Sequence, residues 1–462
     1  MISLYACIHF LSFFWPSEWL SNLLSLFGIL SLLVTFFYMK PRVMILPLFL
    51  TISSIAIMLL SSKGNIFPGI WEGILQMRAL ISLLFIVPIV SWVLRYEPYI
   101  EEVMIFSRKH LNNSKSFYGG IMSVTQLVSY FIIIGAVPIM FQFVHTFLKG
   151  KKGEIWDTFK ATTVLRGFAL SSLWIISVPS FSYAVQSTGA SLSIAILQGF
   201  SVSLAGTALA IGFLYFQEKK DPSILSKGIQ EEFNRVLSVK KTDRITYRIV
   251  IEFIILFLSL LVPIFVIHLT LHWDLLIVIP LVVLAWTFIY FLTKRDLYRF
   301  FTEGKYYITR GVPQKGKEMS IFFSAGLLIY ALNISGWGKE FVEGVYYLTE
   351  KLPLINFLWV LPLIIVMLGS IGLGPLMSMV LVGGIIQNID SPYPPELILI
   401  SLTIGSALSI MLSPLVAPVI ILSGANGRSP WNNSFKNNWA YACTFYLLVE
   451  AYVQLMLWSD IL

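Results

Sequence analysis

The sequence predicts an all-α polytopic membrane protein made of two inverted repeats, each with about five transmembrane helices and one re-entrant helical hairpin. Three observations predict this class: an apolar composition, basic residues gathered in a few loops, and an internal sequence echo. Of the 462 residues, 57% are hydrophobic and 12% are charged, and the mean hydropathy is +0.81. A soluble domain carries about a quarter charged residues, so most of this chain must face lipid or lie inside a membrane bundle.

The apolar runs give the expected spans in order, because a helix needs about 20 mostly apolar residues to cross a bilayer. They lie approximately at residues 20–38, 43–61, 74–94, 116–148, 166–190, 192–216, 249–269, 275–292, 320–335, 357–386, 397–425 and 439–458. Residues 2–14 form a shorter apolar piece that could lie at the interface or cross obliquely. We expect it to belong to the mature protein, since it lacks the basic region and cleavage site of a signal peptide.

Two of these segments, 116–148 and 357–386, are long for one span and short for two. Each carries Gly and Pro near its middle: Gly135 and Pro138 in the first, and Gly372, Gly374 and Pro375 in the second. A helical hairpin that enters and leaves on the same side fits both observations. Irregular backbone at membrane depth is tolerated where protein or a cavity covers it.

The basic residues favour this hairpin topology. All Lys and Arg fall in the regions 39–42, 95–115, 149–161, 217–248, 293–319 and 426–438, except Lys63, Arg78, Arg166, Lys339 and Lys351. With both hairpins re-entrant, these six regions share one side, which positive-inside bias makes cytoplasmic. A full crossing by 116–148 would invert the later loops. Arg78 and Arg166 are expected at span edges, and the net charge of +8 is explained by topology rather than by nucleic acid.

The charged stretch 217–248 is predicted to be a cytoplasmic linker between an N-terminal repeat (1–216) and a C-terminal repeat (249–462). Because the hairpins do not cross, each repeat holds an odd number of spans, and the two repeats have opposite orientations. The stretches 95–115 and 336–350 mix charged and apolar residues at helical spacing. They predict amphipathic helices on opposite faces of the membrane.

The internal sequence echo is a match between two stretches 238 positions apart: Gly-Phe-Ala-Leu-Ser at 167–171 is similar to Gly-Ser-Ala-Leu-Ser at 405–409. Without a gap, the match continues through Val178/Val416, Gly189/Gly427 and Ser191/Ser429. Duplicated membrane segments with Gly, Pro and Ser breaks at corresponding positions are typical of secondary transporters.

Each echo lies in a span interrupted by proline, 166–190 and 397–425. Proline removes a helical hydrogen bond and frees backbone groups for ions or solutes. The candidate ligands are Ser177, Pro179, Ser180 and Ser182 in the first span, and Ser413 and Pro414 in the second. The alternative is a simple proline kink with serines bonded back to their own helix. The hairpin glycines would offer main-chain N–H groups, or else only allow tight helix packing.

Further polar candidates follow the breaks. Gln186 and Asn426 are amide candidates for a polar solute. Arg428 and Arg166 could bind an anion or simply anchor the inner boundary. Glu450 lies inside the last span, where a carboxyl group either couples protons or is kept neutral or paired. No histidine has metal-site spacing with a carboxylate, and Cys7 and Cys443 predict neither a disulfide nor a zinc site.

The order of elements resembles the ion transporter superfamily, which includes divalent-anion/sodium symporters, arsenite-type permeases and the large membrane subunits of tripartite carboxylate transporters. The stretch Ser324-Ala325-Gly326 followed by Asn333-Ile334-Ser335-Gly336 is similar to the span before the second hairpin in this group. The resemblance implies a fixed scaffold and a mobile transport domain that slides as an elevator, with solute and ions between the hairpin tips and the breaks. The Ser-Asn-Thr signature of the divalent-anion symporters is absent from both hairpins.

We therefore expect a secondary active transporter of the inner or plasma membrane, moving a small polar, carboxylate-like anion coupled to Na⁺ or H⁺, without a cofactor. The expected partners are a small-molecule solute and the lipid bilayer, not nucleic acid, and a homodimer stays open. The alternatives are a polytopic membrane enzyme, or a receptor or assembly protein that retains the fold. We expect no enzyme, since the sequence shows neither a catalytic His/Asp/Glu cluster nor a phosphate-binding loop.

Overall fold

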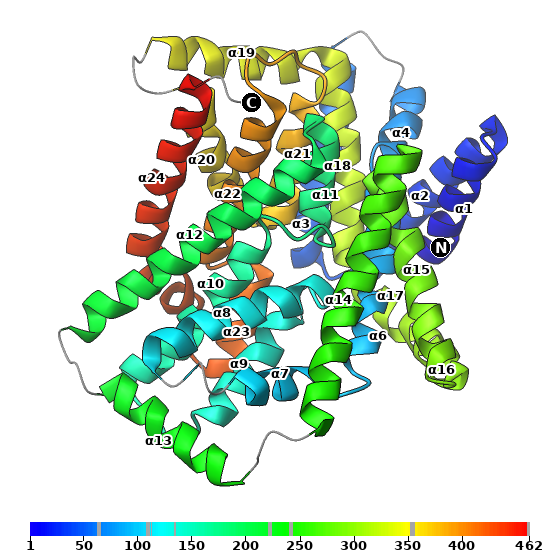
Figure 1. Cartoon of the computed structure of the whole chain (residues 1–462). Coiled ribbons are helices and arrows are strands. Elements are labelled where there is room, and N and C mark those ends of the chain that lie inside the picture. The colour runs from blue at the N-terminus through cyan, green and yellow to red at the C-terminus, as the bar shows by residue number, and fades with distance from the viewer. Residues whose placement is uncertain are drawn as a thin grey trace.

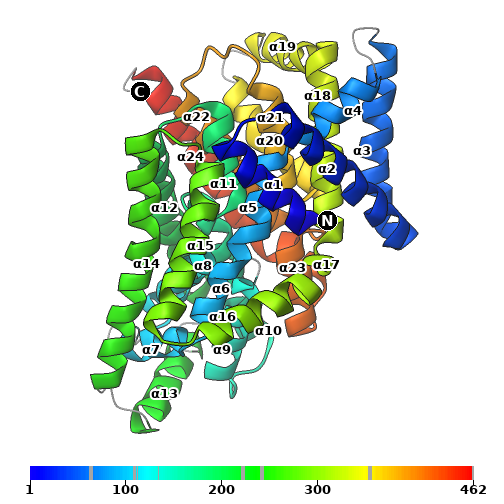
Figure 2. The same ribbon diagram turned by 90° about the vertical axis from the view of Figure 1, so that its right-hand side faces the viewer.

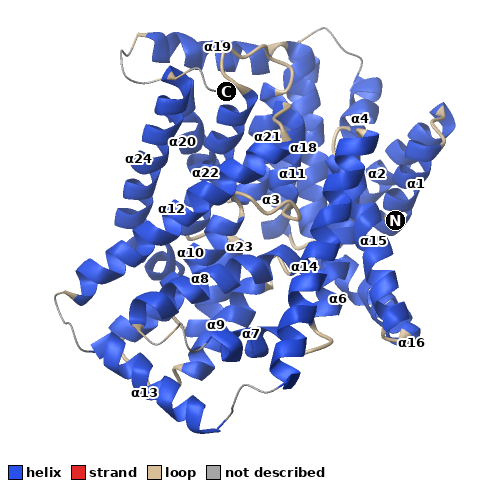
Figure 3. Cartoon of the chain, viewed as in Figure 1, coloured by secondary structure: helices blue, strands red, loops and turns tan. Residues whose placement is uncertain are grey.

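The computed structural model describes residues 1–61, 66–107, 111, 113–133, 135–219, 224–239, 244–351 and 356–459. Helix makes up 85% of the structure, and these ranges contain no strand (Figure 3). Lys63 and the linker residues 220–223 and 240–243 lie outside the described residues. The predicted all-α class is confirmed.

Within the described ranges, nine helices are long and apolar enough to cross a membrane. They cover Glu18–Tyr38, Val43–Leu60, Ile66–Leu94, Leu192–Glu218, Arg244–Leu271, Leu275–Thr293, Gly316–Ser335, Pro395–Asn426 and Asn432–Trp458. The chain is therefore a multi-pass membrane protein, as its composition predicts.

The helices pack as two groups. Group A consists of α1 (Ile2–Phe14), α2 (Glu18–Tyr38), α3 (Pro41–Leu60), α4 (Ile66–Leu75), α5 (Arg78–Ile86), η1 (Val87–Val90), α6 (Ser91–Leu94), α7 (Tyr99–Ser107), α14 (Arg244–Leu271), α15 (Leu275–Thr293), α16 (Leu297–Tyr306), η2 (Tyr307–Gly311), α17 (Val312–Gln314), α18 (Gly316–Ser335) and α19 (Trp337–Glu350). In this group α18 packs on α2, α3 and α4, while α5 packs on α1 and α15 (Figure 2).

Group B consists of α8 (Ser114–Phe131), α9 (Ala136–Phe147), α10 (Glu154–Ser171), α11 (Pro179–Thr188), α12 (Leu192–Glu218), α20 (Phe357–Ser370), α21 (Gly374–Ile386), α22 (Pro395–Leu412), α23 (Ala417–Asn426), η3 (Asn432–Lys436) and α24 (Asn437–Trp458). Its closest packing joins α8 to α10 and α20 to α22. The seam with group A is formed mainly by α11 against α5 and α15, and by α21 against α18 and α19.

Each segment expected to be a hairpin folds as two short helices joined by a turn, α8 with α9 and α20 with α21. The first pair contacts α13 (Ile224–Val239) through α8, and the second pair contacts α19 through both helices. Because α13 and α19 lie at opposite ends of the molecule in both views (Figures 1 and 2), the two pairs reach opposite ends. The predicted amphipathic segments form helices α7 and α19, also at opposite ends (Figure 1).

Two predicted span edges are wrong. The first interrupted helix begins at Glu154, not near residue 166, so Arg166 lies inside α10 and is buried. The third span begins at Ile66, so Arg78 lies near the middle of Ile66–Leu94, where it opens α5 after a break at Gln76 and Met77. Arg166 is covered by neighbouring helices, whereas Arg78 is exposed and lines a cavity. A side chain that faces protein or a polar cavity does not need the apolar character that marks a lipid-facing span.

The echoed glycines have the same structural role in both copies. A Cβ on Gly167 would lie 2.9 Å from the Cα and carbonyl oxygen of Met122 in α8. A Cβ on Gly405 would lie 2.9 Å from the same two atoms of Pro362 in α20. Each glycine therefore lets the helix after a hairpin approach the backbone of that hairpin's first helix. Small residues permit this close contact in membrane proteins.

Candidate functional site

The first break separates α10 from α11 over residues 172–178. Ser177 is buried there, and its hydroxyl donates to the carbonyl oxygen of Tyr130, in the last turn of α8. Ser182 bonds back to the carbonyl of Ile176. Pro179 is the first residue of α11, where proline loses no helical hydrogen bond, and Ser180 follows it and is buried.

The second break separates α22 from α23 over residues 413–416. The fully buried Ser413 donates its hydroxyl to the carbonyl oxygen of Gly369 at 3.1 Å, in the last turn of α20. The hydroxyl oxygen of Ser413 also accepts the backbone N–H of Leu415 at 3.2 Å. Pro414 lies in the turn itself, outside both helices.

The two breaks are thus built alike. Each has a non-helical turn, and each has a serine bonded to the last turn of the neighbouring hairpin's first helix. The alternative of a simple proline kink, with serines bonded back to their own helix, is wrong for Ser177 and Ser413. Each of these serines donates to a carbonyl of a neighbouring helix instead. Beyond the breaks the pairing crosses over, since α11 packs against α21 and α23 packs against α9. Both α11 and α23 end at a left-handed glycine, Gly189 and Gly427.

The hairpin tips differ from each other. In the second tip, Gly372 and Gly374 have φ of +101° and +75°, conformations that favour glycine, and Pro375 follows in the first turn of α21. In the first tip, Gly135 has an ordinary φ of −71°, so its backbone conformation does not require glycine. Pro138 lies in the first turn of α9.

The predicted inner-boundary residues are tied to protein partners. Asn426 exchanges side-chain hydrogen bonds with Asn433 and accepts the backbone N–H of Arg428 at 2.9 Å. Arg428 lies 3.5 Å from the carboxylate of Asp157 and donates to the hydroxyl of Thr158 at 3.2 Å. Asn426 therefore ties the end of α23 to η3, and Arg428 fastens the loop after α23 to the start of α10.

Glu450 is fully buried in α24, and neither carboxylate oxygen has a hydrogen-bond partner within the described chain. Gln454 lies one turn further on, but its amide is bonded to Asn356 at 2.7 Å. Gln454 is the neighbouring polar group of this carboxyl. The carboxyl is therefore either kept neutral or paired with this neighbour, or it couples protons, as expected for an ionisable group inside a bundle.

A cavity of about 1060 Å³ lies between groups A and B. Group A contributes His9 of α1 and Arg78 of α5, among others, and α11 contributes Tyr183, Gln186 and Ser187 from the opposite side. This group-seam cavity contains one predicted site residue, Gln186. Its side-chain oxygen is buried and has no hydrogen-bond partner among the described residues.

Sequence reasoning missed His9 and Arg78 as residues of this cavity. Both ring nitrogens of His9 are buried without a partner in the described structure, and Arg78 makes no ion pair there. For Arg78, the length of the apolar run could have given the position. If the span is taken to begin at Ile66 rather than at residue 74, Arg78 lies near its middle. No comparable signal marks His9, because its burial depends on how α1 packs against α5.

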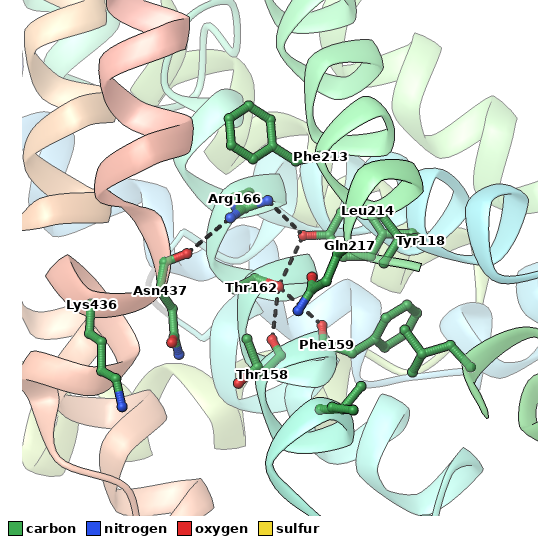
Figure 4. Close-up of a pocket in the computed structure, with 12 residues that line it drawn as sticks. Tyr118, Thr158, Phe159, Thr162, Arg166, Phe213, Leu214, Gln217, Lys436 and Asn437 are labelled. Carbon is green, nitrogen blue, oxygen red and sulfur yellow. Dashed lines mark hydrogen bonds between the residues drawn. The ribbon is translucent and has the colours of Figure 1, made fainter. Parts of the chain in front are cut away.

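Arg166 is a buried cation, with 7% exposure. Its Nε donates to the side-chain oxygen of Asn438 at 3.0 Å, and its two terminal nitrogens donate to the Tyr118 hydroxyl and the Asn437 carbonyl at 3.3 and 3.1 Å (Figure 4). The guanidinium also lies 4.3 Å over the Tyr441 ring. All four partners are uncharged.

The structure thus defines a multi-pass helical membrane protein with two braced helix breaks and a polar cavity between two helix groups. No protein-family model matches the chain, and no curated protein matches it in sequence. Among the residues that the structure describes, no three His, Cys, Asp or Glu side chains are placed to hold a metal ion.

Proposed function

We propose that this protein is a secondary active transporter that moves a small polar, anionic solute coupled to Na⁺ or H⁺ by an elevator movement. The observation that carries the proposal is the matched pair of braced breaks, in which Ser177 and Ser413 each donate to the end of a hairpin helix. Discontinuous helices beside hairpin ends provide the backbone groups with which secondary transporters bind solutes and ions.

Several matched features support inverted repeats. The order of a helix pair, an interrupted helix and a long helix occurs twice, over α8–α12 and α20–α24. Gly167 and Gly405 make equivalent backbone approaches. The two helix pairs contact α13 and α19, which lie at opposite ends of the molecule (Figure 1).

The division into groups A and B supports the elevator. Group B contains both hairpins and both breaks, as a mobile transport domain would, and group A would be the scaffold. The group-seam cavity lies on the path along which the two would slide, and its polar lining leaves Gln186 and His9 with buried, unpartnered atoms. The lining carries Arg78 together with the carboxylates of Glu18, Glu72 and Asp274, so the choice of an anionic solute rests on the half-helix N-termini at the two breaks and not on the charge of this cavity.

The test is uptake into proteoliposomes of a panel of labelled small carboxylates, with an inward Na⁺ gradient, an inward H⁺ gradient or neither. We expect gradient-dependent accumulation, reduced at least tenfold in a Ser177→Ala, Ser413→Ala double variant. The matched control is Ser201→Ala, because Ser201 is exposed on α12 and bonds only to its own helix. No accumulation of any panel member would reject the proposal.

A further inference from the structure

A second cavity, of about 290 Å³, lies within group B where α8, α10 and α12 meet α13 and the start of α24 (Figure 4). Its polar lining comes from Tyr118, Thr158, Thr162, Arg166, Gln217, Lys436 and Asn437. The rest of the wall is aliphatic and aromatic, with Phe159 and Phe213 as its largest apolar members. We call this the Arg166 cavity.

The lining of the Arg166 cavity is electropositive. It contains two cations, Arg166 and Lys436, and no carboxylate. Arg166 makes no ion pair within the described chain, and Lys436 lies 3.7 Å from Glu154 in a largely exposed pair. The pair of Lys436 is exposed and screened by water, so the charge that no carboxylate of the described chain pairs with is that of the buried Arg166.

Hydrogen-bond donors are also left over. A guanidinium has five N–H groups, and Arg166 uses three of them in the bonds described above. The side-chain nitrogen of Asn437 is buried and has no partner among the described residues. A buried donor without an acceptor costs free energy, and a buried unpaired charge costs more.

We propose that the Arg166 cavity binds an oxyanion, namely the carboxylate or phosphate of a small molecule with an apolar body. Arginine binds planar oxyanions through two parallel N–H groups, Lys436 adds charge at the rim, and the phenylalanine side of the wall accommodates the apolar body. A volume near 290 Å³ is at the small end for ligand pockets, which limits the ligand to a few carbon atoms. The site is distinct from the hairpin ends and does not depend on transport.

A purely structural role for Arg166 would account for only part of this geometry. Its bonds to Asn437 and Asn438 tie the start of α24 to α10, and a helix tie of this kind needs donors but no anion. A helix tie alone does not explain why the buried charge of Arg166 has no carboxylate partner, why a second cation lines the cavity, or why the side-chain nitrogen of Asn437 has no acceptor among the described residues. The two roles therefore predict different results in a binding experiment.

The experiment measures equilibrium binding to the purified full-length protein in nanodiscs of zwitterionic lipid, by isothermal titration calorimetry. Separate arms use butyrate, benzoate, inorganic phosphate and a water-soluble short-chain phosphatidic acid. We expect saturable binding in at least one arm, and any second ligand that binds should compete with the first. Binding of the lipid analogue alone supports the oxyanion site and assigns its source to a lipid headgroup.

Variants locate the binding. Lys436→Gln should weaken it about 3- to 10-fold by removing one partly screened charge, whereas Lys152→Gln should not change it. Lys152 is exposed and does not line the cavity. Arg166→Lys keeps the charge but loses the two parallel N–H donors of the guanidinium, and should weaken binding further.

No saturable binding in any arm, or equal affinity in the wild type, Lys436→Gln and Arg166→Lys, would overturn the inference. Lys436 is a rim residue in a largely exposed pair, so Lys436→Gln should fold normally. It stays informative even if Arg166 proves essential for folding. Because no gradient is involved, a protein that binds the anion but accumulates no solute keeps this inference and rejects the transport proposal.

Discussion

Gly167 and Gly405 should each be intolerant of a single added methyl group. In Gly405→Ala the new Cβ would lie 2.9 Å from the Cα and carbonyl oxygen of Pro362 and 2.7 Å from the Cβ of Ile365. In Gly167→Ala it would lie 2.9 Å from the backbone of Met122 and 3.0 Å from Thr125. Ordinary contacts of a Cβ begin near 3.4 Å, and backbone atoms cannot rotate away, so the helices must separate.

The expected change in the free energy of unfolding follows from two opposing effects. Overpacking of a well-packed core costs about 1–3 kcal/mol, and replacing glycine by alanine inside a helix returns up to about 1 kcal/mol. Each variant should therefore be destabilised by about 1–2 kcal/mol. Gly212→Ala in α12 is the matched control, because nothing lies within 4 Å of its added Cβ. It should gain up to about 1 kcal/mol.

The assay is reversible unfolding in mixed micelles at rising mole fractions of sodium dodecyl sulfate, followed by tryptophan fluorescence. The order of stability should be Gly212→Ala first, then wild type, then the two repeat variants. If Gly167→Ala and Gly405→Ala unfold at or above the wild-type midpoint, the close approach of α10 to α8 and of α22 to α20 is refuted. If only one of them is destabilised, the equivalence of the two copies fails.

Three further outcomes are expected. Ser413→Ala should lose about 1 kcal/mol in the same unfolding assay, the usual net value of one hydrogen bond; an unchanged midpoint would remove the brace at the second break. Glu450→Gln should leave the fold intact and abolish any dependence of uptake on a proton gradient, and a variant with the full proton dependence would exclude this carboxyl from coupling. In a background with Cys7→Ser and Cys443→Ser, which removes the exposed cysteines of the described chain, Lys152→Cys should react with an impermeant maleimide only from the cytoplasmic side. Labelling from outside would contradict the re-entrant first hairpin.

Hydropathy and break residues predicted most of the helical elements. Each lipid-facing helix must present about 20 apolar residues, so the spans corresponding to α2, α3, α12, α14 and α15 are close to their predicted bounds. Glycine and proline marked both hairpin turns and both interruptions, because those residues determine where a helix can begin, end or bend. The predicted amphipathic segments became α7 and α19 for the same local reason.

The predictions failed where helices are shielded from lipid. Helix α10 contains Asp157, Lys160 and Arg166, and Lys160 and Arg166 are nevertheless buried. Neighbouring helices replace lipid around them, so the apolar pattern that marks a span is not required. Arg78 lies at mid-span for a different reason, because it is exposed and lines the group-seam cavity. Hydropathy detects the solvent a helix faces, not the partner it packs against.

The sequence alone determined that this is a helical membrane protein, where its helices break, and which glycines and serines recur 238 positions apart or nearly so. Only the tertiary structure decided what those residues touch. It brought Ser177 to the carbonyl of Tyr130, Ser413 to that of Gly369, and Arg166 to side chains of α24 more than two hundred residues away. Such contacts depend on how whole helices pack against one another, and a local pattern of residues does not specify which distant helix will be the neighbour.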